Sequence, residues 1–216
     1  WTHTDQSSKS SELICIQGLV ALTSNKERTL VVYEGSHKLH HSYFKEKREP
    51  IEKRLINIKK ELKEIKDEEK INILKKDKQT LECELKKLNQ NWQLIDHEVL
   101  KKISGQKRIL EVPAGALVLW DSRTFHQNQY GKPKSEDRIV QYVSYLPKKN
   151  SLNSKVMQKK RLKYFQEQRT TSHWAYPIKV NGLQPRTYGD KSKLIDYDSI
   201  PMNDLSDLED QINLII

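Results

Sequence analysis

The sequence has little cysteine and no long apolar run. Its longest apolar stretches lie near residues 13–22 and 30–33, far short of the roughly 20 residues that a transmembrane helix needs. No secretory signal is visible. The two cysteines, Cys15 and Cys83, form neither a disulfide framework nor a metal-binding spacing. These absences predict an intracellular, cytoplasmic protein with no membrane contact.

Aromatic residues make up only 7% of the chain, although its formal net charge is +10. A basic chain invites a nucleic-acid interpretation. Basic and aromatic residues rarely alternate here, however, and many lysines lie in a segment that is also rich in glutamate. Nucleic acid is therefore an alternative partner that we do not favour, and it would show as binding that weakens steeply with salt.

Strand-like sequence flanks a segment of different character. Apolar and β-branched residues dominate residues 13–22, 29–33, 108–112, 116–120 and 139–146. We therefore expect a mainly β core formed by residues 1–44 and 104–148. The chain begins with Trp1, directly at a candidate site, so we expect this core to be truncated at its N-terminus and to lack a preceding strand.

Residues 45–103 have a heptad-like pattern. Apolar residues recur at spacings of three and four among Lys and Glu, which predicts a coiled coil. They are Ile51, Leu55, Ile58, Leu62 and Ile65, and then Leu74, Leu81, Leu85, Leu88, Trp92 and Ile95. Because the register breaks across residues 66–70, we expect two antiparallel helices that turn there. Pro50 suits the first turn of the first helix.

Residues 149–216 form a helical and irregular C-terminal extension in this interpretation. Residues 149–170 are basic and helix-like, and residues 171–202 are irregular. Leu205, Leu208, Ile212 and Ile215 predict one short amphipathic helix in the acidic tail. His173 and Trp174 either line a substrate pocket or pack in an aromatic core.

The residues with a chemical role lie at the ends of predicted strands. His3 and Asp5 are two positions apart, so on a strand both side chains point to the same face. His126 follows the strand of residues 116–120, and Arg138 comes twelve residues later. Two histidines and one carboxylate are the facial triad that holds Fe(II) and leaves positions open for a co-substrate and O2. The guanidinium of Arg138 suits the far carboxylate of a keto-acid chelated to that iron.

The sequence resembles the phytanoyl-CoA dioxygenase (PhyH-like) family of Fe(II)/2-oxoglutarate oxygenases. The resemblance covers about residues 1–44 and 107–147, and residues 169–177 also resemble C-terminal regions of family members. It is carried by WTHTD (residues 1–5), LVVYEGSHK (30–38), PAGALVLWDSRTFH (113–126) and Arg138. The fold that it implies is a double-stranded β-helix, or jelly roll, here with the antiparallel helical hairpin of residues 45–103 inserted between two strands.

The resemblance also implies roles for single residues. His3, Asp5 and His126 would bind iron as the catalytic centre, and Arg138 would bind the C5 carboxylate of 2-oxoglutarate. Gln17 and Thr29 are weaker candidates for the co-substrate pocket. His37 is expected to stabilise the Gly-Ser-His turn rather than to bind metal. Trp120, Asp121 and Arg123 are expected to brace the loop that carries His126.

The function predicted from these features is an Fe(II)/2-oxoglutarate-dependent dioxygenase. It would use O2 to hydroxylate a small organic substrate, with release of succinate and CO2. The alternative is a non-catalytic β-helix module that acts as a protein-interaction scaffold through its hairpin. For residues 45–103 themselves, a solvated hairpin without chemistry is favoured over an arm for a protein partner or for self-association.

Overall fold

The chain divides into two compact units, residues 1–141 and residues 142–216. The computed structural model describes residues 1–176, 178–180, 184 and 187–214. Helices contain 40% of the residues and strands 17%, so the prediction of a mainly β protein is wrong. Element length explains the difference, because the strands have two to six residues each whereas the two longest helices have 25 and 21.

The first unit contains a five-stranded antiparallel sheet with the order β4-β1-β7-β3-β5. In chain order its strands are β1 (His3–Thr4), β3 (Leu30–Tyr33), β4 (Gln93–Leu94), β5 (Lys107–Ile109) and β7 (His126–Asn128). β1 lies between β4 and β7, so the start of the chain is covered on both edges by much later segments. Both neighbours fix the backbone of β1 by hydrogen bonds.

A second antiparallel pair in this unit joins β2 (Ile16–Ala21) to β6 (Leu117–Asp121) over five residue pairs. Gln17, Leu19 and Ala21 alternate along one face of β2, and each is at most 1% exposed. This alternation is the period of a strand with one buried face. A polar residue, Gln17, therefore lies in the interior beside two apolar ones.

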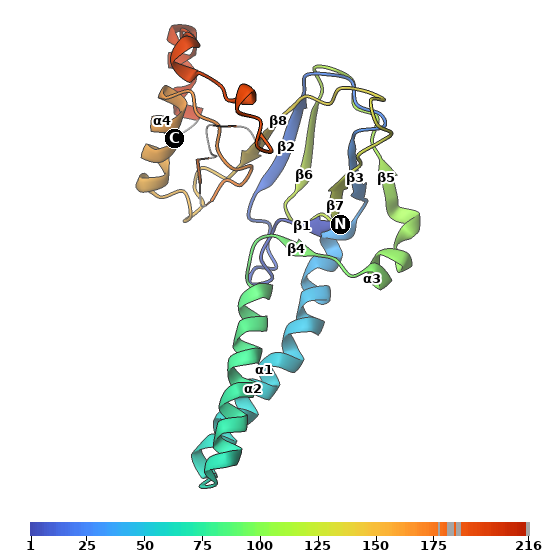
Figure 1. The fold of residues 1–216 in the computed structure, drawn as a ribbon, viewed down its shortest axis with the longest axis vertical. Helices are drawn as coiled ribbons and strands as arrows, with labels where there is room; N and C mark the ends of the chain where they lie inside the picture. The colour runs from blue at the N-terminus through green and yellow to red at the C-terminus, as the bar shows by residue number, and fades with distance from the viewer. Residues whose placement is uncertain (177, 181–183, 185–186, 215–216) are drawn as a thin grey trace. The chain divides into compact units, whose positions relative to one another are not determined.

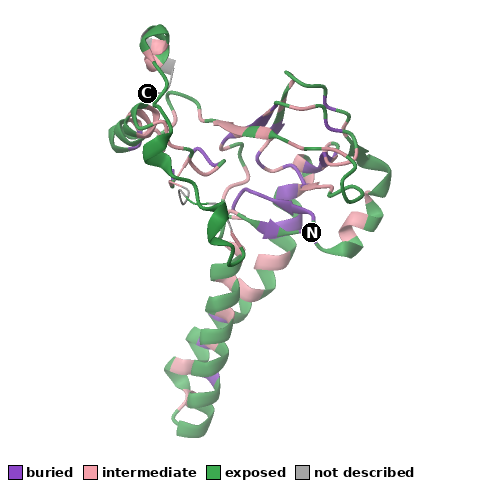
Figure 2. Ribbon diagram, turned by 45° about the horizontal axis from the view of Figure 1, so that its top comes forward, coloured by how far each residue is buried: buried purple, intermediate pink, exposed green. Residues whose placement is uncertain are grey.

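Between β3 and β4 the chain forms an antiparallel pair of helices, α1 (His40–Glu64) and α2 (Glu68–Leu88), shown in Figure 1. Leu55, Ile58 and Leu74 are buried where the two helices meet. Most other positions along the pair are exposed, and they are green in Figure 2. The hairpin is thus held by a narrow apolar seam with the spacing of a coiled coil.

The two helices turn without glycine or proline. Ile65 leaves α1 in extended backbone conformation, with φ −83° and ψ 139°. The side chain of Asp67 accepts a hydrogen bond from the backbone N–H of Lys70, at 3.1 Å. An aspartate at this position satisfies one of the unpaired donors in the first turn of α2.

The first helix begins earlier than its predicted start. It follows the 3-10 turn η1 (Ser36–Leu39) directly, so Pro50 lies inside α1 and the prediction of Pro50 in the first turn is wrong. Tyr43 and Phe44 explain the early start, because both side chains are buried in an aromatic cluster of the β core. The other buried members of that cluster are Tyr33, Ile95 and Phe125.

The second helix ends at Leu88, so Trp92 and Ile95 lie beyond it and their predicted place in the seam is wrong. The backbone of β4 pairs with β1 instead, which draws this segment out of the helix. Ile95 joins the aromatic cluster, and Trp92 remains 48% exposed. The short helices α3 (His97–Lys102) and η2 (Ser104–Gln106) then lead to β5.

The second unit begins within β8 (Val140–Tyr145) and contains one longer helix, α4 (Lys155–Gln166). Three 3-10 helices follow: η3 (Lys191–Lys193), η4 (Tyr197–Ser199) and η5 (Ser206–Leu214). The predicted amphipathic tail helix is thus a 3-10 helix, η5, and Ile215 lies outside the described residues, as does Pro177. In the described part of the chain, no helix has the length and apolar character required to cross a membrane.

Candidate metal centre

His3, Asp5 and His126 meet in the interior of the first unit. Their ligand atoms all lie within 4.8 Å of one another. The three residues are 6%, 5% and 5% exposed, respectively. They could hold a metal ion, because two imidazoles and a carboxylate that converge in a buried position are a common ligand set.

The sheet brings these residues together from the two ends of the first unit. His3 lies on β1, and Asp5 follows two residues later on the same face. His126 begins β7, and the antiparallel register places it directly opposite His3. The two imidazole centroids are 4.4 Å apart. Strand pairing therefore joins ligands that are far apart in the sequence.

Each imidazole is oriented through its Nδ1 atom. Nδ1 of His126 is 2.9 Å from the carbonyl oxygen of Thr124, and Nδ1 of His3 is 3.3 Å from that of Trp1. A carbonyl oxygen can only accept, so these contacts place the ring hydrogen on Nδ1. The opposite nitrogen, Nε2, then points toward the carboxylate of Asp5 in both residues, at 3.7 Å for His3 and 3.4 Å for His126.

The carboxylate of Asp5 is oriented by a buried amide. Nε2 of Gln17 donates a hydrogen bond to Oδ2 of Asp5 at 2.9 Å, and Nε1 of Trp120 donates to Oε1 of Gln17 at 3.1 Å. The ring of Trp120 also lies 5.4 Å from that of His126. Gln17 was predicted to line a co-substrate pocket, and the structure gives it this contact with Asp5. Trp120 was predicted to brace the loop of His126.

Two further tryptophans surround His3. The ring of Trp1 is stacked on His3 at 5.1 Å, and the ring of Trp92 is tilted against it at 5.4 Å. Both are partly exposed, so they form the solvent side of the imidazole. Trp92 was predicted to lie in the helical seam because of its spacing, and it was not predicted to be a site residue.

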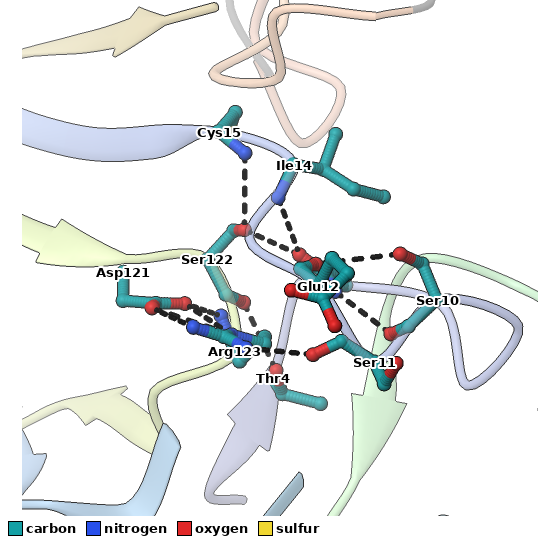
Figure 3. A network of polar contacts seen from close by, with 10 residues as sticks. Thr4, Ser10, Ser11, Glu12, Ile14, Cys15, Asp121, Ser122 and Arg123 are labelled. Carbon is teal, nitrogen blue, oxygen red and sulfur yellow. Dashed lines mark hydrogen bonds and ion pairs between the residues drawn. The ribbon is translucent and has the colours of Figure 1, made fainter. Parts of the chain in front are cut away.

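A polar network joins the ligand strand β1 to the segments beside it, as Figure 3 shows. Thr4, which separates His3 from Asp5, donates from its hydroxyl to the carbonyl oxygen of Ser122 at 3.0 Å. The hydroxyl of Ser122 accepts a hydrogen bond from the backbone N–H of Cys15 at 3.4 Å. The same hydroxyl donates to the side chain of Gln6, at 2.7 Å. These bonds tie β1, the start of β2 and the end of β6 together at the base of the site.

Arg123 and Asp121 form a second part of this network (Figure 3). Nη2 of Arg123 lies 2.6 Å from Oδ2 of Asp121, and Nη1 donates to the carbonyl oxygen of Ser11 at 2.6 Å. Burial alone would raise the pKa of Asp121, but the hydrogen bonds from Arg123 outweigh it and hold that pKa below its ordinary value. The pair therefore fixes the chain that leads into His126.

The Gly-Ser-His turn contacts the strand that carries His126. Gly35 has a φ of 74°, which a residue with a side chain rarely adopts. The turn buries Ser36, whose hydroxyl accepts a hydrogen bond from the backbone N–H of Phe125 at 2.8 Å. His37 lies in η1, near enough to Asp121 for its charge to lower the pKa of that carboxyl. The metal-competent group among the described residues does not include His37.

The other predicted site residues lie elsewhere. Thr29 is fully buried just before β3, and its hydroxyl donates to the carbonyl oxygen of Leu110 at 2.7 Å. Arg138 is half-buried just before β8. The backbone N–H of its neighbour Ile139 donates a hydrogen bond to the hydroxyl of Thr23. Thr23 follows the C-terminal end of β2, whereas Gln17 lies near its N-terminal end. His173 and Trp174 belong to the second unit, where they line a cavity.

Comparison with known proteins gives no match: no family model matches the chain, and neither a curated protein nor a solved structure is significantly similar to it. The comparisons therefore assign neither a family nor an activity to the chain.

Proposed function

We propose that this protein is an Fe(II)/2-oxoglutarate-dependent dioxygenase that hydroxylates a small organic substrate. The single observation that carries the proposal is the convergence of His3, Asp5 and His126 within 4.8 Å in a buried position. The resemblance of the ligand segments to the PhyH-like family supports it. We also propose that the two antiparallel sheets are the core of that family's jelly roll.

The ligand set fits Fe(II). Two ligands that bind one ion at about 2.1 Å and at right angles lie about 3 Å apart. The distances of 3.4 Å and 3.7 Å between Asp5 oxygens and imidazole Nε2 atoms are close to that separation. Two neutral imidazoles and one carboxylate would also leave the site with net positive charge and open positions.

The chain would contribute binding and orientation to this reaction. His3, Asp5 and His126 would hold the metal, and the hydrogen bond from Gln17 would fix the carboxylate of Asp5. The indole rings of Trp1 and Trp92 would limit the access of water to His3. Bound Fe(II) with 2-oxoglutarate would supply an O2-dependent oxidation that hydroxylates a C–H bond and converts the keto-acid into succinate and CO2.

Arg138 is the proposed partner of the distal carboxylate of 2-oxoglutarate. A guanidinium binds a carboxylate through two parallel hydrogen bonds, and its charge persists at any physiological pH. Arg138 lies near one end of β2, and Gln17, which contacts Asp5, lies at the other. Arg138 would bind the distal carboxylate of a co-substrate held at the triad through its long side chain.

The proposal is tested by anaerobic titration of the protein with Fe(II) and 2-oxoglutarate, followed by visible absorption. We expect a weak metal-to-ligand charge-transfer band in the wild type, its loss in Asp5→Ala, and a weakened band in Arg138→Ala. The matched controls are Asp77→Ala and Arg108→Ala, which change exposed residues outside the site and should leave the band intact. Absence of the band from the folded wild type would contradict the enzyme proposal and favour the scaffold alternative.

A further inference from the structure

The second unit contains a cavity of about 540 Å³, and the described residues that line it lie between Tyr142 and Ile178. Small-molecule sites commonly have volumes of about 300–1,000 Å³. Its walls come from β8, from the loop that follows it, from α4 and from residues 171–178. The cavity is therefore formed by several segments of one unit, as a binding site for a small molecule would be.

The cavity is cationic. Lys148 and Arg161 line it, and no aspartate or glutamate is among the described lining residues. The side chain of Asn153, also in the lining, accepts a hydrogen bond from Nη2 of Arg161, which orients the guanidinium. Burial lowers the pKa of Arg161. A cation in a partly desolvated wall attracts an anion more strongly than one in open water.

The segment that forms the cavity is basic. Residues 142–178 contain eight Lys and Arg but only one Glu and no Asp. Five of the basic residues lie on α4, which has no acidic residue. The local field therefore favours an anionic ligand.

The lining also contains aromatic and hydroxyl-bearing side chains. Tyr145 lines the cavity while 51% exposed, and the buried Trp174 adds a second aromatic side chain. The rings of Tyr142 and His173 meet with centroids 5.6 Å apart. Ser144, Thr171 and Ser172 supply hydroxyl groups. Such a wall suits a ligand with a flat ring and polar edges, because rings stack on aromatic faces and hydroxyl groups bond to their edges.

We propose that this cavity binds a nucleoside phosphate. Lys148 and Arg161 contact the phosphate, and Tyr145 provides the stacking face for the base. Hydroxyl groups of the lining contact the sugar or the base edge. The cavity shares no residue with the candidate metal centre, so this proposal does not depend on the dioxygenase proposal.

The test is calorimetric titration of the metal-free full chain with adenosine 5′-monophosphate, with inorganic phosphate and adenosine as separate arms. We expect the nucleotide to bind more tightly than either fragment, and to bind more weakly as salt is raised. Equal affinity for inorganic phosphate, or binding of a single-stranded oligonucleotide without binding of the mononucleotide, would overturn the proposal.

Substitutions of the lining residues test whether the nucleotide binds in this cavity. Arg161→Gln should weaken nucleotide affinity about tenfold or more, the usual loss for a hydrogen bond to a charged group. Lys148→Gln should weaken it about threefold, since Lys148 is exposed. Tyr145→Leu should weaken binding of the nucleotide without changing that of inorganic phosphate.

The control is Lys149→Gln, which removes the same charge from the neighbouring exposed residue outside the lining. Its affinity should equal that of the wild type. If Lys148→Gln and Lys149→Gln have the same affinity, the cavity is not the binding site. Lys148 is exposed, so this pair remains informative even where Arg161→Gln does not fold.

Discussion

The β region and the helical hairpin of the first unit bury different kinds of side chain. Around the candidate metal centre the interior is polar, and Thr4, Gln6 and Gln17 are fully buried there. Along the hairpin beyond its first turns, the buried side chains are Leu55, Ile58 and Leu74. Buried polar groups are costly unless they are hydrogen-bonded, so they accumulate where bonds fix the position of a functional group. We infer that the buried polar side chains of the β region position the ligands, whereas the buried side chains of the hairpin only pack its two helices together.

Among substitutions that would separate the roles of the two regions, we expect the largest effect from Ile58→Ala. Ile58 is 0% exposed in the seam, and loss of such a side chain costs about 2–4 kcal/mol through lost burial and the cavity left behind. Amide hydrogen exchange of α1 and α2 should accelerate strongly while the affinity for Fe(II) stays unchanged. The control is Ile56→Ala, two residues away and 54% exposed, which should change neither quantity. Weakened metal binding in Ile58→Ala would break the separation of roles.

An intermediate effect is expected from Gln17→Leu in the β region. The substitution removes the donor to Asp5 and the acceptor of Trp120, and loss of a residue that orients a metal ligand typically weakens metal affinity about 10–100-fold. Fe(II) affinity measured anaerobically should fall in this range, while hydrogen exchange of the hairpin stays at the wild-type rate. Gln79→Leu, at an exposed position of α2, is the matched control. Unchanged affinity in Gln17→Leu would show that Gln17 does not position Asp5.

The smallest effect is a pH dependence from His40, where the hairpin enters the β region. His40 is 1% exposed and its Nε2 lies 3.1 Å from the carbonyl oxygen of Gln6. Burial lowers its pKa, against the raising effect of that hydrogen bond. The unfolded chain then binds a proton more readily than the folded one. The stability contribution is therefore present above the unfolded pKa of about 6.5 and is lost as the pH falls below it.

This dependence is measured as the free energy of unfolding of metal-free protein in urea at pH 7.5 and pH 5.5. His40→Gln keeps an amide donor but does not titrate, so the advantage of the wild type over this variant should shrink at the lower pH. His41→Gln changes the exposed neighbour, and its free energy of unfolding should change between the two pH values as much as that of the wild type. An equal change in the free energy of unfolding between the two pH values in His40→Gln and the wild type would contradict the prediction.

The local periodicities of the sequence determined a large part of the first unit. The spacing of two between His3 and Asp5 predicts a shared face, and the structure brings both beside His126. The apolar spacing of residues 51–88 predicts the helical pair, including a turn that has no glycine or proline. These features follow from the period of a single element, which the sequence expresses directly.

The helix boundaries and the neighbours of the site residues depend on contacts between distant segments, which only the tertiary structure shows. The helix boundaries differ from the predicted ones because Tyr43, Phe44 and Ile95 pack in the aromatic cluster. Trp92 lies beside His3 because β4 pairs with β1, and the side chain of Gln17 on β2 reaches Asp5 from the other sheet. The period of a single helix or strand does not predict such pairings, because they arise from burial and hydrogen bonding between residues of different elements. The residue types of the candidate site are thus readable from the sequence, whereas the side chains that surround and orient them follow from how the strands pack.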